Sequence, residues 1–264
     1  MKKKIILLII LIAVFVVLGI VFKNPKMSPS SSSKELVVVD SFEVKVLNED
    51  STFVKVDVKY PSFKNVSEDF NTQIKNLLQE KIDEHKKASG EYWQARYDTQ
   101  TKGENIPKVP TSDDKLSFFS DFVIVQSNSN YISFVLKYGG FSGGAHGYEN
   151  YVTYNYDVKN QKIVGLSDLF KNNTDYLKYL SDESRKDLKE KYATLTEEDK
   201  KNSSDEAVKE YINNMVLMIE DGTKPTAENF STFTFTPDKV KIYFAQYQVG
   251  PYAIGMPEVE VERE

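Results

Sequence analysis

The sequence predicts an α+β fold in which an antiparallel β-sheet has helices packed on one face, preceded by a single N-terminal transmembrane helix. Runs of alternating apolar and polar residues, typical of strands, follow one another closely in several parts of the chain. Runs with apolar residues every three or four positions, typical of helices, are grouped apart from them. This segregation does not suit a repeated β–α–β alternation.

The N-terminal part predicts a membrane anchor. Residues 5–22 contain no charge and no proline, and their length nearly spans a hydrocarbon core. Residues 1–4 carry three lysines, which predict a cytoplasmic N-terminus and a C-terminal domain outside the cell membrane. A cleaved signal peptide is the alternative, although it usually has a shorter apolar region and a small-x-small cleavage site, which is missing here. Residues 23–35, rich in serine and proline, predict a linker.

Residues 36–264 are expected to form one extracytoplasmic domain with an apolar core. The chain has no cysteine, so the domain cannot depend on disulfides, while sixteen tyrosines and sixteen phenylalanines supply core material. Residues 1–33 hold five lysines and no acid, so the net charge of −5 leaves −10 for residues 34–264. An acidic domain argues against nucleic acid or another anionic polymer as a partner and permits a cationic one, although solubility alone explains the charge at least as well.

Strands and one long helix are expected in the first part of this domain. The strand patterns cover residues 36–39, 42–46 and 53–60, and Pro61 is expected to end the last of them. Residues 66–87 place apolar side chains at three- and four-residue spacing, which predicts a helix.

Residues near both ends of this helix have expected roles. Ser67 is the predicted N-cap. His85 is expected to be solvated near the polar end of the helix, where a positive charge is favourable to the helix dipole. Residues 90–114 are the least regular part of the chain and are expected to form a loop docked at one end by Tyr92 and Trp93. A mobile, insertion-like loop is favoured over a binding role.

A hairpin and a third strand are expected next. Residues 118–126 and 131–138 are separated by the turn-rich residues 127–130, and the strand pattern at 148–158 follows. Because these strands are adjacent in sequence, an antiparallel meander is expected.

The second half is expected to contain helices and a second hairpin. The helices carry charged outer faces that are most simply solvated surface, and Ser167 is the candidate cap of the first. The expected elements are helical regions at 166–170, 176–192 and 206–220, a hairpin at 233–244 that turns at Pro237 and Asp238, and an edge strand at 259–261.

Two loops stand out as a candidate binding surface. The glycine-rich loop at residues 139–147 contains one of only two histidines, and the glycines allow a tightly bent backbone. The second loop, residues 247–255, combines a Gly-Pro bend with tyrosines, which bring a large contact area at low entropic cost. The candidate binding residues are Ser142, Gly143, Gly144, His146, Gly147, Tyr247, Pro251 and Tyr252. The structural alternative is that His146 bonds a backbone carbonyl and fixes the loop.

Catalysis and metal binding have little support in the sequence. Ser142 and His146 could form a triad with Asp157 or Glu149, but no Gly-x-Ser-x-Gly elbow is present. Two distant histidines without cysteine disfavour zinc, and no calcium-binding loop is found. No catalytic residue, metal or cofactor is therefore predicted.

Two segments carry a resemblance to a known family. The first begins with Gly-Gly-Ala-His-Gly at residues 143–147 and continues through Asn155 to Leu-Ser-Asp-Leu-Phe at 166–170. The second is Tyr-Gln-Val-Gly-Pro-Tyr-Ala-Ile-Gly at residues 247–255. Together they resemble the extracytoplasmic domain shared by PdaC-type cell-wall proteins and RsiV-type lysozyme-sensing anti-sigma factors. The resemblance covers most of the chain from about Leu36 onward and implies an α+β domain.

The resemblance implies a membrane-anchored, outward-facing binding domain of the bacterial cell envelope, with a lysozyme-like muramidase or peptidoglycan as partner. PdaC-type proteins carry a separate deacetylase domain that is not expected after Glu264, so deacetylation is not expected of this chain. RsiV-type proteins place a sigma-binding segment before the membrane helix, where this sequence has only residues 1–4. Binding is therefore expected to sequester or inhibit the partner without signalling. The alternative is a cell-envelope hydrolase or another enzyme that uses His146.

Overall fold

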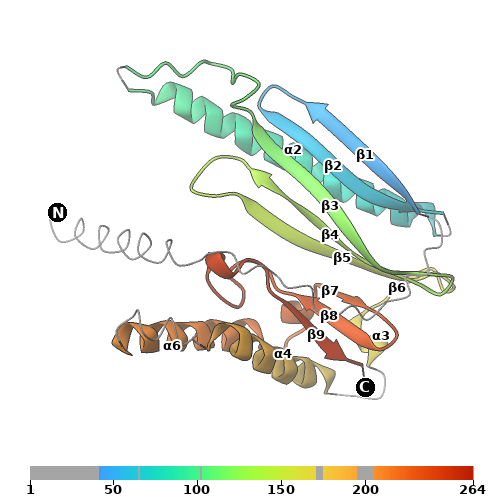
Figure 1. Cartoon of the computed structure of the whole chain (residues 1–264). Helices are drawn as coiled ribbons and strands as arrows, with labels where there is room; N and C mark the ends of the chain where they lie inside the picture. The colour runs from blue at the N-terminus through green and yellow to red at the C-terminus, as the bar shows by residue number, and fades with distance from the viewer. Residues whose placement is uncertain (1–41, 65, 102, 171–174, 195–204, 264) are drawn as a thin grey trace, which may run out of the picture. The chain divides into compact units, whose positions relative to one another are not determined.

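The computed structural model describes residues 42–64, 66–101, 103–170, 175–194 and 205–263 (Figure 1). The expected anchor at 5–22, the linker at 23–35 and the strand at 36–39 lie outside these residues. Within the described ranges, no helix combines the length and the apolar character needed to cross a bilayer.

A six-stranded sheet forms the first half of the fold, in the order β1-β2-β3-β4-β5-β6 (Figure 1). Neighbouring strands are antiparallel except β2 and β3, which run parallel. The strands are β1 (Phe42–Asp50), β2 (Val54–Phe63), β3 (Leu116–Ser127), β4 (Tyr131–Phe141), β5 (Tyr148–Asp157) and β6 (Lys162–Ile163). The expected hairpin of β3 and β4 and the following β5 are confirmed.

The expectation of a purely antiparallel sheet is wrong at one pair of strands. A long helix, α2 (Glu68–Asp98), leaves the end of β2 and returns the chain to the start of β3, so that Val54 pairs with Leu116 in parallel register. A parallel pair needs such a crossover. The sheet is therefore mixed.

Pro61 does not end β2, which continues to Phe63. Pro61 lies opposite Val44 of β1, whereas β3 pairs only with residues 54–58 of β2. No β3 residue pairs with Pro61, so no hydrogen bond to β3 is lost because proline lacks an N–H. The strand therefore tolerates the proline.

Helix α2 covers one face of the six-stranded sheet, and its apolar side chains form the first hydrophobic core with it (Figure 1). The Ser67 hydroxyl accepts a hydrogen bond from the Phe70 N–H at 3.3 Å, which confirms the expected N-cap. Phe70, Ile74, Leu78 and Ile82 are all buried and follow the helical repeat.

The helix is longer than expected because its buried face continues past residue 87. Ser89 and Trp93 are buried one and two turns beyond His85, and the helix ends at Asp98. The Trp93 Nε1–H donates to the Pro107 carbonyl at 3.0 Å, so Trp93 docks the following segment from within the helix. The expected loop at 90–114 is wrong for its first nine residues.

The second half has its own three-stranded antiparallel sheet and its own core (Figure 1). One sheet alone was expected, so this is a correction. The N-cap of α3 is Gly165 and not Ser167, since the helix begins at Leu166. The Asp168 carboxylate accepts a hydrogen bond from the Gly165 N–H at 3.0 Å and so stabilises this helix start. The elements are α3 (Leu166–Leu169), α4 (Tyr176–Tyr192), α6 (Asp205–Gly222), the 3-10 helices η1 (Glu228–Phe230) and η2 (Tyr252–Ile254), and strands β7 (Phe233–Phe235), β8 (Lys239–Tyr243) and β9 (Glu258–Glu262).

Side chains join the two sheets at the free edge of β7, which we call the polar seam. Its four members project from β3, β4 and β5 and bond the β7 backbone: Gln126, Ser133, Thr153 and Asn155. The Asn155 amide donates to the Phe233 carbonyl at 2.7 Å, and the Ser133 hydroxyl accepts from the Phe235 N–H at 2.9 Å and donates to Asn155 Oδ1 at 2.6 Å. The seam satisfies backbone groups that would otherwise be buried without partners.

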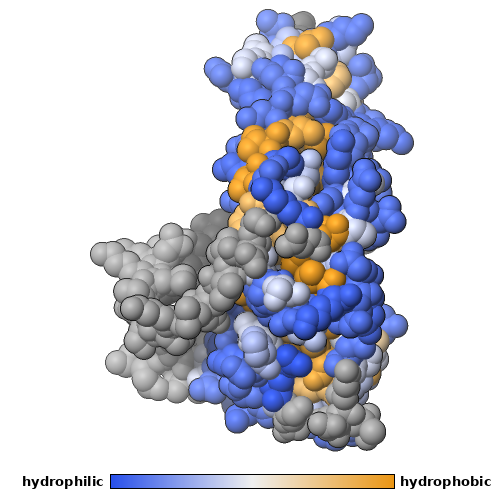
Figure 2. All heavy atoms as spheres, turned by 90° about the vertical axis from the view of Figure 1, so that its right-hand side faces the viewer, coloured by the Kyte–Doolittle hydropathy of each residue, from blue (hydrophilic) through white to orange (hydrophobic). Residues whose placement is uncertain are grey.

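Apolar side chains also reach the surface of the first sheet. Val44 and Val46 of β1 and Val123 of β3 are 52%, 57% and 62% exposed. The face shown in Figure 2 carries a broken band of hydrophobic residues between hydrophilic ones. Single exposed apolar residues are ordinary on protein surfaces.

Candidate functional site

The glycine loop, residues 142–147, joins β4 to β5. Gly140 belongs to β4, opposite Tyr148, and not to the loop as expected. A Cβ at Gly140 would lie 2.1 Å from the Ser117 carbonyl oxygen, so only glycine fits there. Gly143 has φ +102°, and its Cβ would lie 2.2 Å from the ring of Tyr92 on α2. The loop is therefore held against α2 by contacts that a larger residue would disrupt.

The second predicted loop meets the glycine loop at His146. The rings of His146 and Tyr252 stack with centroids 4.0 Å apart and planes inclined by 27°. The Tyr252 hydroxyl donates to the Gly147 carbonyl at 3.1 Å. His146 Nδ1 donates to the same carbonyl at 2.9 Å, so Nε2 is the acceptor, and the Tyr247 hydroxyl lies 3.4 Å from it. We call His146, Tyr247 and Tyr252 the aromatic cluster.

The structure thus brings four of the eight predicted binding residues into direct contact: His146, Gly147, Tyr247 and Tyr252. The other four have different positions. Gly143 packs on Tyr92, while Gly144 is exposed, with open space where a Cβ would be. Ser142 is half-buried at the start of the loop, and Pro251 precedes η2 as its N-cap.

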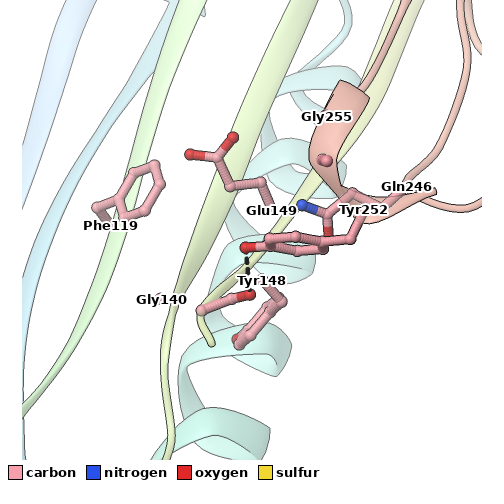
Figure 3. A pocket seen from close by; sticks show the side chains of 9 residues that line it. Phe119, Gly140, Tyr148, Glu149, Gln246, Tyr252 and Gly255 are labelled. Atoms are coloured by element: carbon pink, nitrogen blue, oxygen red, sulfur yellow. Dashed lines mark hydrogen bonds between the residues drawn. The ribbon is translucent and has the colours of Figure 1, made fainter. Parts of the chain in front are cut away.

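An open groove of about 390 Å³ adjoins the aromatic cluster (Figure 3). Phe119 of β3 and Tyr252 of η2 lie on opposite sides of it, and the Glu149 carboxylate and the Gln246 amide provide its polar groups (Figure 3). The remaining lining residues are Gly140, Gly147, Tyr148, Ala253 and Gly255. The groove therefore combines residues of the six-stranded sheet with residues of the C-terminal loop.

The Glu149 carboxylate that lines the groove is paired with a lysine that does not itself line it. The Lys137 ammonium lies 2.7 Å from the Glu149 carboxylate, and both side chains are little more than one-third exposed. Lys137 and Glu149 sit on neighbouring strands, β4 and β5. The pair presents a dipole and no net charge to a ligand.

The suggested triad is not assembled. Asp157 lies at the far end of β5 from the loop and accepts hydrogen bonds from the backbone and side chain of Asn160, which hold its pKa below the usual range. Glu149 pairs with Lys137, and both nitrogens of His146 are engaged by Gly147 and Tyr247. His146 therefore fixes the loop geometry, as the structural alternative expected.

His85 is not solvated as expected, but buried, with 2% of its surface exposed. It lies between α2 and the sheet, where its Nδ1 is 2.9 Å from the Tyr148 hydroxyl. Burial lowers the pKa of His85, and the nearby carbonyls of Ser117 and Phe141 offset this only in part. Burial also raises the pKa of Tyr148 to about 12, so both side chains are uncharged near neutral pH.

Sequence reasoning missed Phe119 and Gln246 as lining residues of the groove. Phe119 offered a signal, because strand alternation that turns Phe118 to the core turns Phe119 to the opposite face. Gln246 offered none, since its position depends on how the C-terminal loop folds. The described residues contain no group of His, Cys, Asp and Glu side chains arranged to hold a metal ion.

Comparison with known proteins agrees with this architecture. Residues 47–149 match the family described as "Deacetylase PdaC", and residues 167–264 match "Protein of unknown function (DUF3298)". The chain is 25% identical over 259 residues to the peptidoglycan-N-acetylmuramic acid deacetylase PdaC of Bacillus subtilis (strain 168). The match covers 96% of this chain and 48% of that protein, so the chain spans about half the length of this relative.

A solved structure shares the fold. The crystal structure of a DUF3298 family member from Bacteroides fragilis NCTC 9343 aligns with a TM-score of 0.53 at 17% identity, over 84% of this chain and 90% of that one. The fold and the groove define an α+β protein with a surface site where the six-stranded sheet meets the C-terminal loop. The chain therefore carries a PdaC-like segment followed by a DUF3298 segment, the arrangement of a PdaC-like extracytoplasmic domain.

Proposed function

We propose that this chain is a membrane-anchored extracytoplasmic binding module that recognises a cell-wall component through the groove and the aromatic cluster. The observation that carries the proposal is the meeting of Phe119, Glu149, Gln246 and Tyr252, from distant parts of the sequence, in one open groove. Clefts with aromatic walls and a few convergent polar groups are typical ligand sites. The peptidoglycan-directed relative supports the cell wall as the source of the ligand.

The proposed role is binding without catalysis. The groove-side acid, Glu149, is paired with Lys137, and His146 is occupied by its loop contacts. In the described part of the chain, neither side chain is hydrogen-bonded to a serine, threonine or cysteine that it could activate. These contacts support a recognition surface over an active site.

Co-sedimentation with purified peptidoglycan sacculi tests the proposal. The full chain, held in a detergent without sugar headgroups, is expected to sediment with sacculi, and Phe119→Ala is expected to remain in the supernatant. Val123→Ala, on the same strand and 62% exposed, is the control that should still bind. Equal sedimentation of all three proteins would assign the binding to another surface, and no sedimentation at all would remove the cell wall as the ligand.

A second candidate partner is a cationic lysozyme-like muramidase. The observation that favours it is the net charge of −10 on residues 34–264, which would steer a cationic protein towards this domain. The resemblance to lysozyme-sensing proteins supports the same partner. Residues 142–147 and 250–252 are then at or near the contact, and the binding sequesters or inhibits the muramidase.

Calorimetry with a cationic lysozyme at low and high salt tests this partner. Binding is expected to weaken as salt screens the charges. Tyr252→Ala is expected to cost on the order of 2 kcal/mol if Tyr252 is a central contact. The absence of heat at micromolar protein in low salt would exclude the muramidase and leave the wall component as the ligand.

A further inference from the structure

The ring of Phe119 is not part of either hydrophobic core, so core packing does not account for it. It projects from the sheet face opposite α2, where it lines the groove. A half-buried phenylalanine beside an open groove offers a flat apolar face to a ligand. On the other side of the groove, Tyr252 offers a second ring (Figure 3).

The polar groups of the groove are suited to hydroxyl and amide groups. The Gln246 side-chain amide has no protein partner in the described part of the chain, so it can both donate to and accept from a ligand. Glu149 supplies an acceptor in the groove, and the Lys137 ammonium beside the groove supplies a donor 2.7 Å from it. A ligand hydroxyl can bond to either member of such a pair.

The balanced charge restricts the ligand further. A cation bound beside Glu149 would have to compete with the Lys137 ammonium that is already in place. An anion there would face the Glu149 carboxylate. An uncharged polar ligand meets neither penalty and keeps the ion pair intact.

We infer that the groove takes an uncharged sugar ring, held between Phe119 and Tyr252, with hydroxyl or acetamido groups bonded to Gln246 and to the Glu149–Lys137 pair. The volume of about 390 Å³ is near the lower end of the range of ligand pockets, about 300–1,000 Å³, and suits a small saccharide unit. This inference rests on the proposed function and names the chemical class of its ligand.

Three soluble trisaccharides of matched length test the inference. Triacetylchitotriose is uncharged, chitotriose carries ammonium groups, and a trigalacturonate carries carboxylates. Calorimetry with the full chain, in a detergent without sugar headgroups, is expected to give saturable binding of triacetylchitotriose only. Phe119→Ala is expected to weaken it at least about tenfold, and Val123→Ala is expected to leave it unchanged.

A charge variant separates recognition from a loss of folding. Lys137→Gln removes the ammonium and leaves the Glu149 carboxylate unpaired in the groove. This variant is expected to bind chitotriose more tightly than triacetylchitotriose, which reverses the preference of the parent. A structural role of Lys137 alone would weaken both without reversing their order.

The outcomes distinguish this inference from the proposed function. Sedimentation with sacculi but no binding of triacetylchitotriose would overturn the sugar inference and keep the wall-binding function. Binding of triacetylchitotriose without sedimentation would support the groove chemistry and overturn the wall as its source. Equal binding of the three trisaccharides would overturn the charge argument.

Discussion

At the scale of single residues, two neighbouring glycines of the glycine loop differ in one respect that can be measured. Gly143 and Gly144 both have positive φ, at +102° and +104°, but only Gly143 faces a ring, that of Tyr92. Gly144→Ala is expected to cost about 1 kcal/mol of unfolding free energy from backbone strain alone. Gly143→Ala is expected to cost about 3 kcal/mol, because strain and overpacking add. Equal costs in urea unfolding would show that the Tyr92 contact is unimportant.

His146 is expected to act on stability and not on chemistry. His146→Ala removes the stack on Tyr252 and the hydrogen bond to Gly147. Since the ring is exposed, the expected cost is only about 1 kcal/mol of unfolding free energy, together with faster amide exchange in the loop. A wall-hydrolysing activity that disappears in this variant would overturn the non-catalytic role.

His85 predicts how stability depends on pH. Burial lowers the pKa of His85 in the folded protein, so below its ordinary value of about 6.5 the unfolded chain binds more protons. The contribution of His85 to stability is therefore complete above that pH and is lost as the pH falls through the folded pKa. Urea unfolding from about pH 8 to about pH 5 is expected to show a steeper decline for the parent than for His85→Gln. Parallel curves would contradict this assignment.

At the scale of elements, the polar seam predicts a large effect of one amide. Asn155 bonds the Phe233 carbonyl and Ser133 and is buried, so Asn155→Ala leaves unsatisfied groups between the sheets. The expected loss is about 2–3 kcal/mol of unfolding free energy. Asn150→Ala, on the same strand but half-buried and outside the seam, is expected to cost less than about 1 kcal/mol. Similar losses of unfolding free energy for both variants would show that the polar seam does not contribute more to stability than an ordinary position on β5.

The positions of helices and strands were predictable where local sequence patterns determine them, and not where tertiary contacts determine them. Alternation located β3, β4 and β5, and helical spacing located α4 and α6 within a few residues. The length of α2 was missed because Gly90 and later prolines suggested a loop, while the buried face decided otherwise. The parallel β2–β3 pair follows from the crossover made by α2, which no local pattern records.

The candidate site was predictable in the same partial way. The unusual composition of two loops indicated the aromatic cluster, and the structure places those loops together. The groove wall at Phe119 depends on which sheet face stays open, which follows only from the packing of both halves. Site residues supplied by strands were therefore harder to find than those in loops.

At the scale of the whole molecule, the proposed anchoring predicts how proteases act on intact cells. With lysines at residues 2–4 and an apolar stretch at 5–22, added protease is expected to remove the chain beyond Ser33 and to leave a membrane-bound stub. Immunoblotting of intact and lysed cells follows the fragments. A soluble mature form beginning near Lys26 would favour the cleaved signal peptide.

The shared groove has a consequence for how this family can recombine. Phe119 and Glu149 lie in or at the end of the PdaC-like segment, whereas Gln246 and Tyr252 lie in the DUF3298 segment. A gene that kept one segment and lost the other would retain a hydrophobic core but only one wall of the groove. The proposed ligand recognition would therefore favour inheritance of the two segments as a pair, and a chimera made from two relatives would combine one groove wall from each parent.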